Sequence, residues 1–174
     1  MKTLHIVRGL PGTGKTTFVQ KRFNGILQLE NDQCWITADG KYEYGVGFNN
    51  PRERVEMYMH DMLVRAMCQD VNVAVSSVFC HIASVSKIVE LAKAYNYNFQ
   101  IWLMSSENRR IFRNVHNVPT DAIKSMEREF VYQLPWSQII VGLTLEEYTG
   151  DFDIKVPPKF GYDYHDIPAL ENVQ

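Results

Sequence analysis

Eight consecutive residues near the amino terminus have the types and spacing of a binding site for a nucleoside triphosphate. They match the pattern GxxxxGK[ST] and read Gly9, Leu10, Pro11, Gly12, Thr13, Gly14, Lys15 and Thr16. Glycines let the backbone turn its N–H groups toward phosphate oxygens, and the amino end of a following helix adds positive potential. We expect Lys15 to reach the β- and γ-phosphates and the Thr16 hydroxyl to bind Mg²⁺. Except for Leu10, all of these residues and the adjoining Thr17 are predicted to bind the nucleotide.

An aspartate can position the oxygen that attacks the terminal phosphate, and Asp32 is the candidate for this role. It follows the apolar run at residues 25–29, which is predicted to end beside residues 9–16 as a strand of the same sheet. The alternative for Asp32 is a turn-forming residue that caps the next segment. Asp39 precedes Gly40 and is the better candidate for a turn.

Three arginines follow the fourth strand-like run of the chain. Arginines commonly stabilise the charge that develops on a transferred phosphoryl group. Arg109 and Arg113 are four positions apart and therefore share one face of a helix. We expect Arg113 to take part in catalysis, and we regard Arg109 and Arg110 as weaker candidates for substrate contact. The alternative for all three is a solvated basic face.

Strand-like and helical patterns alternate along the chain. The predicted strands are rich in Ile, Val, Leu and aromatic residues and cover residues 3–8, 25–29, 71–78, 98–104 and 138–144. The predicted helices begin near Thr17, Arg52, Ser84 and Thr120, the last extending through Leu134, and a short one follows Ser105 or Ser106. This alternation predicts an α/β fold, a three-layer sandwich in which the strands pair mainly in parallel. Ligands bind such sheets at the carboxyl ends of the strands, which groups the loops at residues 9–16, 30–35, 76–81 and 104–113.

Composition and charge restrict the class of protein. With 174 residues, 45% of them hydrophobic, the chain has the size of one domain, which we assign to residues 1–156, with an irregular tail at residues 157–174. The net charge of −2 gives no bulk attraction for nucleic acid, so any such contact must be local. No apolar run approaches the ~20 residues that cross a bilayer, so we expect no membrane segment. The three cysteines form no CxxC pair, which suits a reducing compartment, and we predict a cytoplasmic protein.

A likeness to a known family includes the phosphate loop and several strings elsewhere in the chain. They are residues 8–17, residues 39–44, His60, the Arg-Asn-Val-His-Asn-Val-Pro string at residues 113–119, and Met126. Over about residues 4–132 the chain resembles the P-loop kinase family that includes the kinase domain of polynucleotide 5'-hydroxyl kinases and related AAA-type ATPases. The resemblance implies a three-layer P-loop NTPase sandwich with a mainly parallel five-stranded sheet. It also implies ATP as phosphoryl donor together with Mg²⁺. It also implies Asp32 as the general base that activates a hydroxyl, and Arg113 as a lid arginine.

Two positions depart from the family pattern. Polynucleotide kinases of this type have an arginine that grips a substrate phosphate where this chain has Trp35, which can stack on a base or sugar or can plug the pocket. The family's Asp-Thr-Asn after the third strand is replaced by a string that begins at Ser77. This replacement removes a carboxylate expected near the metal and the acceptor hydroxyl. Trp35 and Ser77 are therefore weaker candidates for the substrate site.

Three functions are consistent with these residues. The first is transfer of the γ-phosphate of ATP to the 5'-hydroxyl of a polynucleotide, with a single-stranded nucleic-acid end as acceptor. The second keeps this chemistry but uses a nucleoside, a nucleotide sugar or another metabolite, in line with the missing arginine and the net charge of −2. The third is a nucleotide-binding module with little catalysis that acts through a protein partner, since the family carboxylate is lost and the tail is aromatic around Phe160, Tyr162 and Tyr164. ATP is preferred over GTP because no guanine-reading Asn-Lys-x-Asp string occurs.

Overall fold

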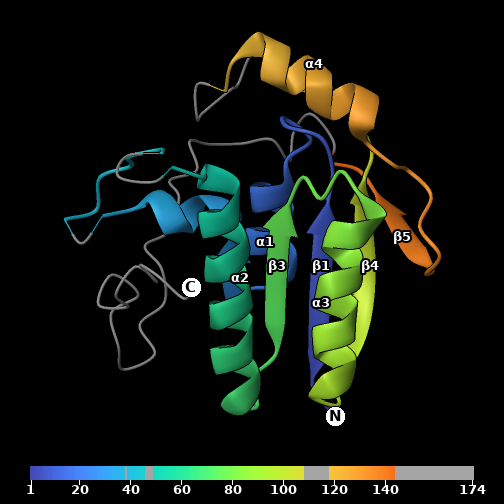
Figure 1. Ribbon diagram of the computed structural model, residues 1–174. Helices are drawn as coiled ribbons and strands as arrows, with labels where there is room; N and C mark the ends of the chain where they lie inside the picture. Colours follow the sequence, from blue (N-terminus) through green and yellow to red (C-terminus); the bar gives the residue numbers. More distant parts are fainter. Residues whose placement is uncertain (38, 46–48, 108–117, 144–174) are drawn as a thin grey trace.

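The computed structural model describes residues 1–37, 39–45, 49–107 and 118–143, and its centre is a parallel β-sheet (Figure 1). The strands within these residues are β1 (Thr3–Arg8), β2 (Leu27–Glu30), β3 (Val73–Ser77), β4 (Asn98–Met104) and β5 (Gln138–Val141). They follow the order β2-β3-β1-β4-β5, and every adjacent pair is parallel. The predicted five-stranded α/β sheet is therefore confirmed.

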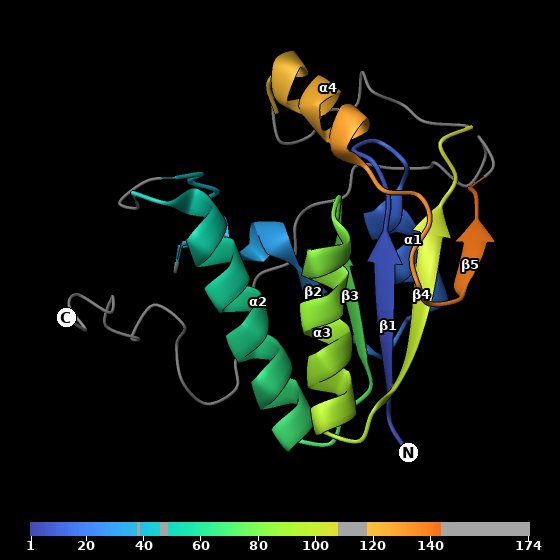
Figure 2. The same ribbon diagram turned by 45° about the vertical axis from the view of Figure 1, so that its right-hand side comes forward.

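Helices cover both faces of this sheet. α2 (Pro51–Cys68) and α3 (Ile82–Ala94) lie side by side on one face, and α1 (Lys15–Arg22) lies on the other, as Figures 1 and 2 show. A short 3-10 helix, η1 (Asn31–Trp35), follows β2. α4 (Thr120–Glu129) crosses above the carboxyl ends of the strands (Figure 2). The three layers predicted from the sequence are present, and the strands end at one common edge.

The core is divided by the sheet into two apolar layers. Met59, Met62 and Met67 of α2 are each at most 5% exposed, so the methionine pattern of this helix serves packing. Ile6 of β1 packs on the α2 and α3 side, whereas the next residue, Val7, packs on the α1 side. Burial of alternate residues on both faces is typical of parallel sheets covered by helices.

The start of α3 differs from the prediction. The helix begins at Ile82, two residues before the predicted capping residue Ser84. His81 takes the cap position because its backbone is extended, with φ −109° and ψ 149°. Its carbonyl accepts a hydrogen bond from the Ser84 N–H at 3.2 Å. Ser84 therefore lies within the first turn of the helix and does not cap it.

The end of α4 also differs from the prediction. The helix stops at Glu129, and Leu134 lies beyond it in irregular structure. The chain leaves the helix because the N–H of Val131 donates to the carbonyl of Cys80 at 2.9 Å, beside the end of β3. A tertiary contact therefore overrides the helical spacing of the sequence.

Some predictions fall on residues that the structure does not describe. These are the tail, its boundary at residue 156 and most of the helix predicted after Ser105 or Ser106. Within the described ranges, no helix combines the length and the apolar character needed to cross a membrane.

The side chain of Arg8, the last residue of β1, is fully buried and joins three segments of the chain. Its guanidinium donates to the carbonyls of Phe79 at 3.0 Å and Val131 at 2.6 Å, and to Gln138 Oε1 at 3.1 Å. Its central carbon lies 4.4 Å from the centre of the Phe130 ring. Burial lowers the pKa of Arg8 to about 10, so the group remains charged at pH 7. The guanidinium therefore holds the loop after β3, the segment after α4 and strand β5 against β1.

We predict that Arg8→Met lowers the free energy of unfolding by about 3 kcal/mol, because methionine fills part of the volume but leaves the buried acceptors without a donor. Urea denaturation followed by tryptophan fluorescence measures this difference. Arg22→Met is the matched control. Arg22 is exposed, and its guanidinium lies 6.0 Å from the centre of the Trp102 ring, so its loss should cost about 0.5 kcal/mol. Equal effects of the two substitutions would show that Arg8 does not hold these segments together.

Candidate active site

The loop between β1 and α1 has the backbone geometry of a phosphate-binding loop. Gly12 and Gly14 have φ angles of 80° and 84°, a region that residues with a side chain rarely adopt. Gly14 occupies the cap position of α1, and the first turn of this helix contains no acidic residue. The first N–H groups of a helix have no partners within it, so this turn offers donors and positive potential to an anion.

Lys15 and Thr13 bond to the loop itself. Lys15 Nζ donates to the carbonyls of Gly9 at 2.9 Å and Leu10 at 3.1 Å, which places the ammonium over the loop. The hydroxyl of Thr13 donates to the carbonyl of Leu10 at 2.9 Å, and Thr13 is buried. Thr17 is also buried. Of the predicted nucleotide-binding residues, Lys15 and Thr16 therefore have the more accessible polar side chains.

A carboxylate that the sequence analysis missed lies against Thr16. Glu30 is the last residue of β2, and its Oε2 accepts a hydrogen bond from the Thr16 hydroxyl at 3.3 Å. The Ser76 side chain also hydrogen-bonds to Glu30, and the charges of Asp32 and Lys15 act on it. Burial, and then the like charge of Asp32, raise the pKa of Glu30. The signal available in the sequence is an acidic residue directly after an apolar run that ends at the ligand-binding edge.

Buried polar side chains fix the backbone of Glu30. Gln33 Oε1 accepts the N–H of Glu30 at 2.9 Å and the hydroxyl of Tyr58 at 3.1 Å. Gln33 is 2% exposed and Tyr58 is 0% exposed. Since Tyr58 belongs to α2, this network connects the middle of α2 through η1 to the end of β2. A buried network of this kind favours a single arrangement of its members.

Asp32, the predicted general base, lies in η1 two residues after Glu30. It is partly buried, and the phenol of Tyr42 hydrogen-bonds to it. Tyr42 reaches this position because its backbone forms an antiparallel bridge with Ile36. Burial, and then the charge of Asp32, raise the pKa of Tyr42, so the phenol stays protonated at neutral pH and can donate to the carboxylate. No role is predicted for Tyr42 from the sequence alone.

Trp35 is packed into the protein. It is 3% exposed, and its ring centre lies 4.9 Å from that of Tyr44. The guanidinium of Arg54 lies 5.5 Å from the same ring and donates to the carbonyl of Cys34. Of the two alternatives for Trp35, this packing favours the plug, because a base could stack on the ring only after these neighbours moved.

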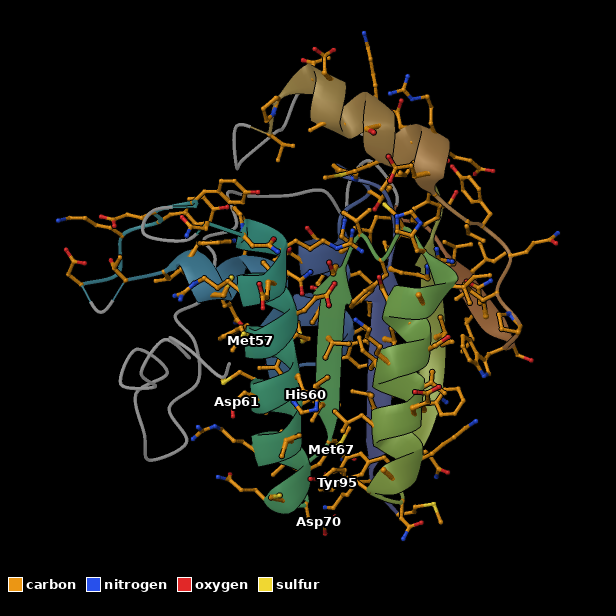
Figure 3. The ribbon with its side chains drawn as sticks, viewed as in Figure 1. Met57, His60, Asp61, Met67, Asp70 and Tyr95 are labelled. Carbon is orange, nitrogen blue, oxygen red and sulfur yellow. The ribbon has the colours of Figure 1, made fainter. Side chains whose placement is uncertain are left out.

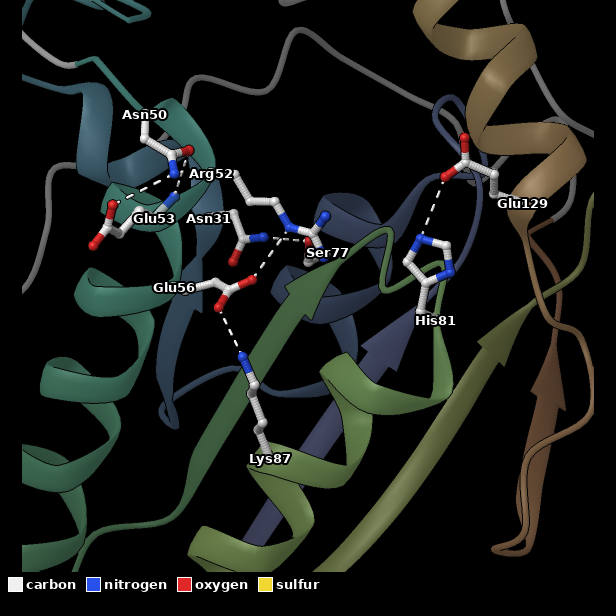
Figure 4. Close-up of polar contacts among 9 residues, drawn as sticks. All are labelled: Asn31, Asn50, Arg52, Glu53, Glu56, Ser77, His81, Lys87 and Glu129. Atoms are coloured by element: carbon white, nitrogen blue, oxygen red, sulfur yellow. Dashed lines mark hydrogen bonds and ion pairs between the residues drawn. The ribbon is translucent and has the colours of Figure 1, made fainter.

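The side chain of Ser77, at the end of β3, takes part in a hydrogen bond. Its Oγ accepts the Asn31 Nδ2 donor at 2.5 Å, which ties β3 to η1 (Figure 4). β3 itself contains no acidic residue. At the start of α3, His81 Nε2 lies 3.3 Å from Glu129 Oε2, so α3 and α4 are also linked at this edge (Figure 4).

Several other polar residues lie away from this edge. His60, part of the family likeness, is exposed about half-way along α2 (Figure 3). Asp61, beside it, pairs with Arg65 at 2.7 Å. Asp70 and Tyr95 lie at the opposite end of the molecule from the phosphate loop (Figure 3). None of these four labelled side chains is placed to act in the same site.

The predicted arginines Arg109, Arg110 and Arg113 lie outside the described residues, so their roles stay predictions. Within the part of the chain that the structure describes, no group of three or more His, Cys, Asp or Glu residues is arranged to hold a metal ion. Mg²⁺ at a phosphoryl-transfer site is usually bound by one or two protein oxygens together with substrate phosphates. The hydroxyl of Thr16, at the start of α1, is a donor of this type.

Similarity to known proteins agrees with this geometry. A family model described as an AAA domain matches residues 4–130. An uncharacterized protein of Pasteurella multocida (strain Pm70), PM0531, is 26% identical over 139 residues, which are 72% of this chain and 75% of that protein.

Solved structures share the fold. A candidate kinase from Chloroflexus aurantiacus J-10-fl has a TM-score of 0.59 at 19% identity, over 86% of this chain and 89% of that chain. A gluconokinase from Sinorhizobium meliloti 1021 has a TM-score of 0.53 at 15% identity, over 84% of this chain and 86% of that chain. A chain of the Pnkp1/Rnl/Hen1 RNA repair complex has a TM-score of 0.58 at 17% identity, over 74% of this chain. The match covers 43% of that chain, so the present chain corresponds to less than half of it. The fold is that of the P-loop kinases.

We predict that Gly9 cannot be replaced without disturbing the loop. A Cβ at this position would lie 2.7 Å from Met104 Cβ and 2.8 Å from Thr13 Oγ1, so the loop or β4 would have to shift. Gly9→Ala should lower the free energy of unfolding by about 1–3 kcal/mol and reduce the increase in Tm that ADP produces. Urea denaturation and melting with and without ADP measure the two effects. Gly142→Ala is the control, because its Cβ would lie 3.5 Å from Ser105 Cβ, an ordinary contact. If both variants behave alike, the close approach at Gly9 does not shape the loop.

Proposed function

This chain belongs to the family described as an AAA domain, and we propose that it transfers the γ-phosphate of ATP to a hydroxyl group. The observation that carries the proposal is that Asp32 and the phosphate loop meet at one edge of the sheet. Glu30 is in contact with the loop through Thr16 at 3.3 Å and is close enough to Asp32 for their charges to interact. A loop alone binds nucleotides, whereas a carboxylate held beside it can also activate an attacking oxygen.

In this proposal the loop binds ATP and Asp32 is the base. Lys15 exchanges its two loop carbonyls for the β- and γ-phosphates, whose charge makes them the stronger partners. Thr16 would hold Mg²⁺, which would supply positive charge to offset that of the phosphates. Asp32 accepts the proton of the acceptor hydroxyl while the hydroxyl oxygen forms a bond to the γ-phosphorus. The bond from that phosphorus to the β–γ bridging oxygen breaks, and ADP leaves with the electron pair. Tyr42 keeps the Asp32 carboxylate oriented through its hydrogen bond.

The first candidate acceptor is the 5'-hydroxyl of a polynucleotide. The family likeness at residues 113–119 supports it, and so does the shared fold with a chain of an RNA repair complex. Arg113 would then stabilise the transferred phosphoryl group, with Arg109 and Arg110 available for substrate contact. The second candidate is a small metabolite. Buried Trp35, at the position where the family has a phosphate-gripping arginine, favours it, and the fold is shared with a gluconokinase.

We predict that Asp32→Asn lowers the rate of phosphoryl transfer by about 10²–10⁴-fold, because an amide cannot accept the hydroxyl proton. Binding of ATP should persist, since the phosphate loop is unchanged. Transfer of label from γ-labelled ATP and calorimetric titration with ATP measure the two quantities. Asp39→Asn is the matched control, because Asp39 is an exposed turn residue that pairs with Lys41 at 2.7 Å. Full activity of Asp32→Asn would exclude Asp32 as the base.

The acceptor is identified by presenting γ-labelled ATP with 5'-hydroxyl DNA and RNA oligonucleotides beside a panel of nucleosides and sugars. Labelled oligonucleotides are the expected result for the first candidate. Label in one metabolite with none in the oligonucleotides would replace the first candidate by the second. The absence of transfer to every acceptor, with ATP binding intact, would favour a nucleotide-binding module that acts through a protein partner.

A further inference from the structure

We infer that Glu30 is a carboxylate of the magnesium site and takes the place of the family carboxylate that is missing at Ser77. The inference rests on the proposed function, since it assigns a ligand within the same site. Its starting point is the contact of Glu30 Oε2 with the Thr16 hydroxyl at 3.3 Å, which puts two oxygen donors side by side. Mg²⁺ is commonly bound through one or two carboxylates in addition to substrate phosphates.

The order of the strands explains why this residue is a glutamate. β3 lies between β2 and β1, and α1 packs against both β3 and β1, so a side chain at the end of β2 must extend over β3 to meet the first turn of α1. Adjacent strands lie about 4.8 Å apart, and glutamate is longer than aspartate by one methylene group. In the sheet register Glu30 lies opposite Ser76. The hydrogen bond to Thr16 shows that the glutamate side chain spans this distance.

Small residues at the end of β3 leave room for the Glu30 side chain. Ser76 is 4% exposed, and its side chain hydrogen-bonds to Glu30. Ser77, the next residue, bonds to Asn31 at 2.5 Å. A carboxylate at residue 77 in addition to Glu30 and Asp32 would bring a third negative charge to the same strand ends, where like charges repel. The loss of the acid from β3 and its gain on β2 are thus compatible with each other.

Hydrogen bonds also fix the position of Glu30, as binding of a metal ion requires. Its backbone N–H is bound by Gln33 at 2.9 Å, and Gln33 is in turn bound by Tyr58. Gln33 and Tyr58 are buried, so the end of β2 has little freedom to move. Hydrogen bonds from neighbouring residues to a metal-binding residue keep it in the geometry that the ion requires. The ammonium of Lys15 lies near enough to offset part of the Glu30 charge in the absence of an ion.

The test is Glu30→Gln, which keeps the size of the side chain and its ability to accept the Thr16 hydrogen bond but removes the charge. Mn²⁺ is used as the probe and is titrated into the complex of the full chain with ADP, with electron paramagnetic resonance reporting free Mn²⁺. Glu30→Gln is expected to weaken Mn²⁺ binding by about 10- to 100-fold. The affinity for ADP in EDTA is expected to stay the same or to increase, because a negative charge near the phosphates is removed. Mn²⁺ affinity equal to that of the wild type would overturn the inference.

Two further variants separate a ligand role from a structural one. Glu90→Gln makes the same chemical change at an exposed position of α3 and should bind Mn²⁺ like the wild type. Ser77→Asp, added to Glu30→Gln, returns a carboxylate to the end of β3 and should restore Mn²⁺ binding to within about fivefold of the wild type. A purely structural role of Glu30 predicts no rescue, and that result would also overturn the inference.

This experiment does not depend on the acceptor. If the wild-type protein binds neither ADP nor Mn²⁺ with ADP, the proposed function fails and the assignment of Glu30 fails with it. If the wild type binds both and Glu30→Gln binds both equally well, only the assignment of Glu30 fails.

Discussion

The buried guanidinium of Arg8 is the interaction on which the carboxyl edge of the sheet depends. It donates to carbonyls of the loop after β3 and the segment after α4, and to the side chain of Gln138 in β5. A buried cation needs such partners, because leaving it or its acceptors unpaired would cost several kcal/mol (~3 or more). The phosphate loop begins at the next residue, Gly9, so it directly follows the residue whose guanidinium holds these segments together. The position of α4 above the loop follows from the same contact.

The site itself is assembled by polar contacts between the ends of neighbouring elements. Thr16 bonds to Glu30 at 3.3 Å and Asn31 bonds to Ser77 at 2.5 Å, while the phenol of Tyr42 bonds to Asp32. Each contact joins a different pair of segments, and parallel strand ends bring those segments together. The result places cationic Lys15 and the carboxylates of β2 and η1 at one edge of the sheet.

A gluconokinase and a chain of an RNA repair complex share this fold, so the fold alone does not specify an acceptor. In this chain Trp35 fills the position of a phosphate-gripping arginine, and Tyr44 and Arg54 cover it. Ser77 is neutral where a carboxylate is expected, and Glu30 provides one from the adjacent strand. The phosphate loop thus keeps the family pattern, whereas the proposed acceptor side departs from it at Trp35 and Ser77.

The sequence by itself determined the phosphate loop, the alternation of strands and helices, and the position of Asp32 after the second strand. These features depend on local patterns, namely glycine spacing and apolar periodicity, which a short stretch of chain contains. Only the tertiary structure decided the contacts of Arg8 and Glu30 and the burial of Trp35, because their partners lie in other segments that the fold brings near. Arg8 meets Val131, which is 123 residues away, and Tyr58 meets Gln33, which is 25 residues away. The end of α4 likewise followed a tertiary hydrogen bond, from the Val131 N–H to the Cys80 carbonyl, whereas the start of α3 followed the local bond between Ser84 and His81.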